Sequence, residues 1–187
     1  MISVTCSARG KTSKGDVRRL RREGKIPVVI YSEGHPAEPG IVVRSEVEAG
    51  MRAIIPGSLP VTVFELKDAA GQVRTALVRE IQYTPTTYEI THIDFLELSP
   101  KRAIEVKVPV EFLNASECIG VKLGGQLRHV LRHVSVRCMP ANIPAQFNVD
   151  VKELGIRQSR RVKDLDISEA VSCLSNIEEV VVSVFKL

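Results

Sequence analysis

The stretch Lys14-Gly-Asp-Val-Arg-Arg-Leu-Arg-Arg-Glu-Gly-Lys-Ile-Pro-Val-Val-Ile-Tyr31 joins a strongly basic segment to an apolar one. Asp16 is an acceptable helix cap, and Pro27, shortly after Gly24, prevents a helix from continuing. This stretch therefore predicts a short helix from about Asp16 to Gly24. The β-branched run Val28–Tyr31 predicts a strand directly after it. A basic helix that leads into a strand is therefore the first element from which we interpret the fold.

Positive charge is concentrated in this region. The whole chain of 187 residues has 26 Lys and Arg against 22 Asp and Glu, a net charge of +4. Residues 9–25 hold eight basic and two acidic residues, so all other residues carry 18 basic against 20 acidic ones. A cluster of one sign commonly meets a polyanion. Opposite Leu20, within an arc of about 100° if the helix extends back far enough, fall Lys14, Arg18, Arg21 and Arg22.

The composition is that of a globular chain with an aliphatic core. Hydrophobic residues make up 44% and charged residues 26%, whereas aromatic residues reach only 4% and Trp is absent. The four Cys form no CxxC pair, which predicts reduced, mostly buried thiols. The apolar runs are too short to cross a bilayer, and residues 1–5 lack the pattern of a secretory signal. We therefore expect a cytosolic protein.

The spacing of alternating apolar segments predicts a mainly β fold with a few short helices. A capping box at Ser45–Glu48 predicts a helix to about Ile54, and Asp68–Gly71 is typical of a hairpin turn. Pro100 and a shift in composition make residues 99–102 the expected linker. The other predicted strands cover residues 2–9, 41–43, 61–66, 73–83 and 88–98 before the linker, and 104–108, 121–126, 130–138, 147–151 and 180–185 after it.

Catalytic and metal-binding patterns are weak in this chain. His129 and His133 would lie on one face of a strand about 13 Å apart, too far for one ion. Gly10-Lys-Thr12 has only the tail of a phosphate-binding loop, and no GxSxG elbow occurs. The sequence therefore predicts neither an enzyme nor a bound cofactor.

Binding to RNA fits the basic segment better. Arginine forks suit phosphate oxygens, and a curved β surface with uncharged polar groups suits the wide minor groove of RNA. On the strand that includes residues 92–94, His92 and Asp94 share a face about 7 Å apart. Asp94 could accept a hydrogen bond from a guanine amino group or orient His92. The polar candidates on predicted strands are Tyr31, Gln82, His92 and Asp94.

These residues, taken together, closely resemble the bacterial ribosomal protein L25 family of the large subunit, in its longer two-domain form, the general stress protein CTC. The resemblance spans nearly the whole chain, and its first block is the most specific. The chain departs from the common pattern at Ser32, where Gly is usual, and at Thr84, where His is usual. The matching blocks are Lys14 to Tyr31, Ile81-Gln-Tyr-Thr-Pro85, His92-Ile-Asp-Phe95, Gly120-Val-Lys-Leu-Gly-Gly125, Ile143-Pro144, Phe147-Asn-Val-Asp150 and Val162-Lys-Asp-Leu165.

The resemblance implies an amino-terminal six-stranded β-barrel with short helices over residues 1–98 and a second β-rich domain over residues 99–187. It implies a structural, ribosome-associated protein of the central protuberance that binds 5S ribosomal RNA at loop E, beside other large-subunit proteins. No small-molecule substrate and no membrane are implied. The family's RNA contacts match Arg9, Lys14, Arg18, Arg21, Tyr31, Gln82, His92 and Asp94, and the charge pattern adds Arg19, Arg22 and Lys25.

Two other functions remain open at this point. The basic segment could instead meet an acidic protein, as in an interaction or stress-response module. A metal hydrolase that uses His129 and His133 would require a bound ion in the purified protein.

Overall fold

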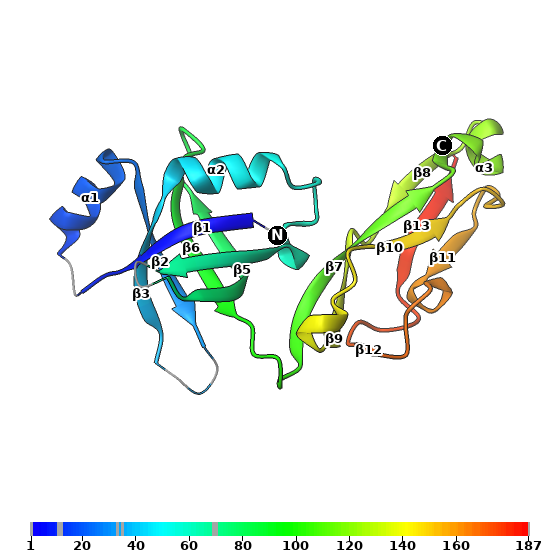
Figure 1. The fold of residues 1–187 in the computed structure, drawn as a ribbon. Coiled ribbons are helices and arrows are strands. Elements are labelled where there is room, and N and C mark those ends of the chain that lie inside the picture. The colour runs from blue at the N-terminus through cyan, green and yellow to red at the C-terminus, as the bar shows by residue number, and fades with distance from the viewer. Residues whose placement is uncertain (1, 11–12, 33, 35, 69–70, 187) are drawn as a thin grey trace. The chain divides into compact units, whose positions relative to one another are not determined.

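The computed structural model describes residues 2–10, 13–32, 34, 36–68 and 71–186. The chain divides into two compact units, Met1–Ser99 and Pro100–Leu187, and each is described here by itself. Strands dominate both units (Figure 1), which confirms the predicted mainly β class. In the described ranges, no helix is long and apolar enough to span a membrane.

Six strands of the first unit close into a barrel in the order β1-β3-β2-β6-β5-β4, which confirms the six-stranded barrel. The pairs β1–β4 and β2–β6 are parallel, and the other four pairs are antiparallel. Closure leaves this sheet without a free edge. The elements are β1 (Ile2–Ala8), α1 (Lys14–Arg22), β2 (Lys25–Tyr31), β3 (Glu38–Val43), α2 (Arg44–Arg52), β4 (Val63–Asp68), β5 (Val73–Tyr83) and β6 (Ile90–Glu97), with a 3-10 turn at Leu59–Val61.

The barrel core is aliphatic, as the composition predicts, with two phenylalanines at its centre. Phe64 and Phe95 meet edge to face, with ring centroids 5.8 Å apart, and both are almost fully buried. Ile93 and Phe95 point into this core, so the next residues along β6 on the other face are available to the outside. The core also holds Val4, Cys6, Ile26, Val28, Ile30, Val42, Val47, Leu66, Ala76, Val78 and Ile90.

Helix α1 begins two residues before its predicted start. Ser13 is the cap, and its side-chain oxygen accepts from the Asp16 backbone N–H at 3.3 Å, while the Asp16 carboxylate accepts from the Ser13 hydroxyl and from its backbone N–H. These hydrogen bonds hold the pKa of Asp16 below its ordinary value. Asp16 is thus the third helical residue, and Lys14 joins the helix. Lys11 and Thr12 of the predicted loop lie outside the described residues.

The predicted capping box of α2 is wrong. The helix begins at Arg44, directly after β3, and no side chain caps it. Glu46 instead accepts hydrogen bonds from the backbone N–H of Thr5 at 2.7 Å and from its hydroxyl at 3.2 Å. A carboxylate in the first turn of α2 therefore joins this helix to β1.

The second unit contains a four-stranded sheet, β10-β7-β9-β12, and a three-stranded sheet, β11-β13-β8. Both have buried Val-rich inner faces. The elements are β7 (Ile104–Leu113), α3 (Ile119–Lys122), β8 (Gln126–His129), β9 (His133–Cys138), β10 (Phe147–Asp150), β11 (Ser159–Arg161), β12 (Val171–Cys173) and β13 (Val180–Phe185). Short 3-10 turns cover Ala115–Glu117, Pro140–Asn142 and Val162–Asp164.

Two strand predictions in this unit are wrong. Residues 121–125 do not form a strand, because the chain turns through α3 and leaves it at Gly124, whose φ of +84° suits glycine, and β8 begins only at Gln126. Residues 130–138 form a strand only from His133 onward. His129 therefore ends one strand and His133 begins another, and the described residues contain no cluster of three or more potential metal ligands.

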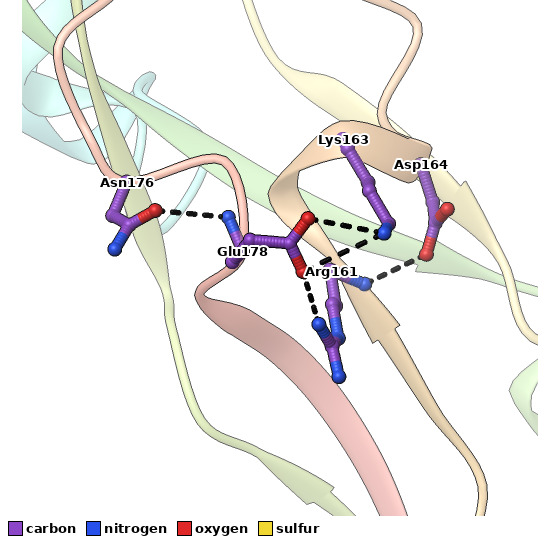
Figure 2. A network of polar contacts seen from close by, with 5 residues as sticks. All are labelled: Arg161, Lys163, Asp164, Asn176 and Glu178. Carbon is purple, nitrogen blue, oxygen red and sulfur yellow. Dashed lines mark hydrogen bonds and ion pairs between the residues drawn. The ribbon is translucent and has the colours of Figure 1, made fainter.

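A network of charged groups joins β11 to the turn before β13 (Figure 2). Glu178 accepts from Lys163 Nζ at 3.2 Å and forms an ion pair with Arg161. Asn176 accepts from the backbone N–H of Glu178 at 3.0 Å, and Asp164 accepts from the backbone N–H of Arg161 at 2.8 Å. Hydrogen bonds from Lys163 and then Arg161 hold the pKa of Glu178 below its ordinary value.

Glu178→Gln should therefore lower the thermal stability of the protein at pH 7. Because the pKa of Glu178 is depressed in the folded state, its contribution is present above the unfolded-state pKa and is lost as the pH falls through the folded-state pKa. Melting curves from pH 7 to pH 3 should show the two proteins converging in acid. The control is Glu153→Gln, at an exposed carboxylate without an ion pair to any described residue. A difference in melting temperature between E178Q and the parent that stays constant with pH would contradict this account.

Candidate nucleic-acid interface

Arg21 holds the basic helix against the barrel. Its Nε and Nη2 both donate to the backbone carbonyl of Thr91, at 3.2 and 3.0 Å, in the middle of the polar segment of β6. The Thr91 hydroxyl in turn donates to the Gln82 carbonyl on β5 at 3.0 Å. One chain of hydrogen bonds therefore joins α1, β6 and β5, and it connects the predicted basic contacts with the predicted polar ones.

Apolar packing beneath α1 is thin. The helix has no fully buried residue, and it packs on β2 with Val17, Leu20 and Arg21 only partly covered. Leu20 thus has the predicted anchoring position but is only half-buried. A helix of nine residues is marginal in water without tertiary contacts. The Arg21 contact and the Ser13–Asp16 capping box therefore carry much of its stability.

The remaining cations of α1 point to solvent. Lys14, Arg18 and Arg22 are exposed, and none of their side chains forms an ion pair or hydrogen bond with any other described residue. Two others share one carboxylate, since Arg19 lies 3.7 Å and Lys25 3.2 Å from Glu23. Arg19 is nevertheless 73% exposed. The helix thus presents a row of cations with little internal compensation, which is the arrangement that phosphate binding requires.

Arg9 occupies a different environment from these cations. Its Nε and Nη1 are buried and have no hydrogen-bond partner among the described residues. The side chain lines a cavity of about 210 Å³ beside Cys6 and the ion pair of Arg74 with Glu38, whose atoms are 2.7 Å apart. Two guanidinium nitrogens of Arg9 therefore face the protein rather than an external strand of RNA.

Three of the polar candidates form a connected group on the outer wall of the barrel. His92 Nδ1 lies 2.7 Å from Asp94 Oδ1, and the Tyr31 hydroxyl donates to Asp94 Oδ2 at 3.4 Å. The Asp94 carboxylate raises the pKa of Tyr31, so this hydroxyl keeps its proton and remains a donor. Of the two roles open to Asp94 in the sequence, the geometry supports the orientation of His92.

The contact with Asp94 decides which groups His92 presents. A carboxylate oxygen 2.7 Å from Nδ1 favours a proton on that nitrogen, and a neutral ring with its proton there has an acceptor at Nε2. Gln82 lies directly opposite His92 in the β5–β6 register, and its side chain is exposed. The wall therefore places Nε2 of His92 beside the Gln82 amide, which can both donate and accept hydrogen bonds.

The sequence analysis missed two residues of this surface. Nothing in the sequence indicated that the backbone carbonyl of Thr91 would receive the Arg21 guanidinium. Glu80 lies opposite Asp94 in the β5–β6 register and also raises the pKa of Tyr31. The polar wall is thus acidic, which disfavours phosphates there and favours groups that donate hydrogen bonds, such as base amino groups.

Arg21→Ala should detach α1 from the barrel. Loss of two hydrogen bonds from a partly buried guanidinium should cost about 1 to 2 kcal/mol, and the backbone amides of α1 should exchange faster with solvent. The exposed neighbour Arg22→Ala is the matched control, expected to change stability by less than about 0.5 kcal/mol. Hydrogen exchange and chemical unfolding of both variants measure these effects. Unchanged protection of α1 in R21A would show that Arg21 does not hold the helix.

Two protein-family models match this chain, one for each structural unit. Residues 4–95 match the model of the Ribosomal L25p family, and residues 103–186 match that of Ribosomal protein TL5, C-terminal domain. The two matches fall within the two structural units.

Three similar proteins from Chlamydia share one name. The chain is 36% identical over 183 residues to "Large ribosomal subunit protein bL25" of Chlamydia pneumoniae, covering 98% of this chain and 97% of that protein. It is 34% identical to the Chlamydia abortus protein and 33% identical to one from Chlamydia trachomatis, each over 98% of both chains. Relatives with this name are structural proteins of the ribosome and not enzymes. With both units matched, this chain belongs to the bL25 family of large ribosomal subunit proteins, in its two-domain form.

Proposed function

We propose that this chain binds 5S ribosomal RNA at loop E, in the central protuberance of the large subunit of cytoplasmic ribosomes, next to other large-subunit proteins. The observation that carries the proposal is the link between two surfaces of different chemistry. A row of exposed cations on α1 is joined through Arg21 and Thr91 to the polar wall of β5 and β6. An irregular RNA loop presents both phosphates and unpaired base edges within a short distance.

The cations supply affinity in this proposal. Lys14, Arg18 and Arg22 have no carboxylate partner among the described residues, so they lose no existing ion pair when they meet phosphates. Arg19 can exchange its long contact with Glu23 for a phosphate at small cost, because exposed ion pairs of this kind contribute little. Neutralised phosphates release counterions, and the free energy gained depends steeply on salt.

The polar wall supplies selectivity. Nε2 of His92 can accept a hydrogen bond from a base amino group or a ribose 2′-hydroxyl, and the exposed amide of Gln82 can bond to a neighbouring edge. Glu80 and Asp94 on the same wall would repel phosphates that approach without such donors. A regular duplex, which presents its backbone first, should therefore be a poorer ligand than a distorted groove.

Removal of the three free cations should weaken binding to 5S ribosomal RNA and make it less dependent on salt. For Lys14→Ala/Arg18→Ala/Arg22→Ala, the slope of log Kobs against log salt concentration should become shallower by about 2 to 3, since each lost phosphate contact contributes about 0.7 to 0.9. Filter binding from 50 to 300 mM salt measures it. The matched control is Arg52→Ala/Lys67→Ala/Lys101→Ala, which removes three exposed cations elsewhere. Equal slopes for the two triple variants, or no binding of the parent protein at low salt, would overturn the proposal.

His92→Ala should reduce the preference for loop E over a regular RNA duplex. One hydrogen bond to a base edge contributes about 1 to 3 kcal/mol, so the preference should fall roughly 10-fold while duplex binding hardly changes. Asp94→Asn should have a similar, smaller effect, because it removes the carboxylate that holds the His92 proton on Nδ1. Competition between loop E and duplex fragments measures both, with Thr75→Ala on β5 as control. An equal loss of affinity for both RNAs would show that the wall does not select.

A further inference from the structure

The second unit has a groove that the proposed function does not use. It is open, has a volume of about 600 Å³, and lies along β8 and the end of β13. The two strands are antiparallel neighbours, with Gln126 opposite Phe185 and Arg128 opposite Ser183. The lining residues are Gln126, Leu127, Arg128, His129, Arg132 and Phe185.

The groove is cationic. Arg128 and Arg132 are exposed, and neither forms an ion pair with any carboxylate in the described part of the chain. Several other cations of this unit have such partners: Arg137 lies 3.5 Å from Glu105, Lys152 lies 3.2 Å from Glu117, and Arg161 and Lys163 share Glu178. Two guanidinium groups without a carboxylate partner in the described part of the chain therefore lie at one groove, as the free cations of α1 lie on one helix.

Neutral and apolar groups lie between the two arginines. The His129 ring packs edge to face on Phe112, with centroids 4.2 Å apart, which holds the imidazole in place. Burial and, after it, the charge of Arg132 lower the pKa of His129, so the ring is neutral at pH 7 and can donate and accept one hydrogen bond each. Leu127 and Phe185 are partly covered and add apolar surface to the groove.

We propose that this groove is a second RNA-binding surface, on which Arg128 and Arg132 hold consecutive phosphates of one strand while His129 and Gln126 contact the sugar or base edges between them. Guanidinium forks match phosphate oxygens, and partly exposed apolar and aromatic side chains match ribose and base faces. An acidic peptide would use the two arginines but would leave Phe185 and the neutral imidazole without matching partners. Because the chain belongs to a family of large ribosomal subunit proteins, the proposal commits to ribosomal RNA as the polyanion.

Arginine footprinting on the full-length protein tests this surface directly. Modification with an arginine-selective dicarbonyl reagent, followed by mass spectrometry, should show Arg128 and Arg132 protected at least threefold by large-subunit ribosomal RNA. Arg137, which is exposed and paired with Glu105, should react equally with and without RNA. Arg18 and Arg22 in the same sample report on the site of the first unit, so failure at one site is distinguishable from failure at the other.

A charge-matched pair of variants adds an independent measurement. Arg128→Gln/Arg132→Gln should make the salt slope for large-subunit ribosomal RNA shallower by about 1.4 to 1.8, corresponding to two phosphate contacts. Arg137→Gln/Lys152→Gln removes the same charge from paired positions and should leave the slope near that of the parent. Equal slopes for the two double variants, or no RNA protection at Arg128 and Arg132, would overturn the proposal. Protection by polyglutamate but not by RNA would also overturn it and would assign the groove to an acidic protein.

Discussion

The contact between the Arg21 guanidinium and the Thr91 carbonyl is the interaction on which the first unit's surface depends. Helix α1 has nine residues, none fully buried, and it would not stay formed on packing alone. Its position decides where Lys14, Arg18 and Arg22 stand relative to β6. The arginine therefore acts from within the protein, while its neighbours on the same helix are free to act outside it. Arg18, Arg21 and Arg22 lie within about one turn of each other, but Arg21 alone of the three bonds to the Thr91 carbonyl, so their roles differ.

Charge in the first unit is segregated between helix and barrel. Residues 9–25 have a net charge of +6, whereas residues 1–8 and 26–99 together hold five basic and ten acidic residues. A polyanion is thus attracted to α1 and repelled by much of the barrel, which orients its approach before any specific contact forms. Glu80 and Asp94, the acidic side chains on the wall, add to this effect because a carboxylate can bond only to groups that donate a hydrogen bond. In the proposed complex, affinity and selectivity would consequently arise from opposite charges on adjacent elements.

Much of this could be predicted from the sequence, because the deciding features are local. The basic segment, the alternation of β6 and the turn at Gly24 each occupy a few consecutive residues, and they predicted the mainly β class and one of the two roles open to Asp94, whereas the barrel was implied by the family resemblance. Contacts between distant segments were not predictable. Glu46 lies in the first turn of α2 but bonds to Thr5, 41 residues away. Arg21 and Arg22 are equivalent as charges, and only the fold places the Thr91 carbonyl beside one of them. Residues 121–126 alternate like a strand, but close approach of Gly125 to the Gly120 carbonyl requires a turn there.

The two cationic surfaces differ in how they arise, and this explains why only one is visible in the sequence. In the first unit the cations are neighbours along 17 residues. In the second, 13 basic and 10 acidic residues are dispersed through residues 100–187 without any basic run comparable to that of α1. In the folded chain some of these cations pair with carboxylates, as in the Arg161–Lys163–Glu178 network, whereas Arg128 and Arg132 lie together at the groove beside Phe185 without a carboxylate partner among the described residues. Such a surface depends on which cations are paired with carboxylates in the folded chain. The net charge of this unit, which is only +3, therefore does not reveal it. The partners available to each cation in the folded chain decide where a polyanion can bind.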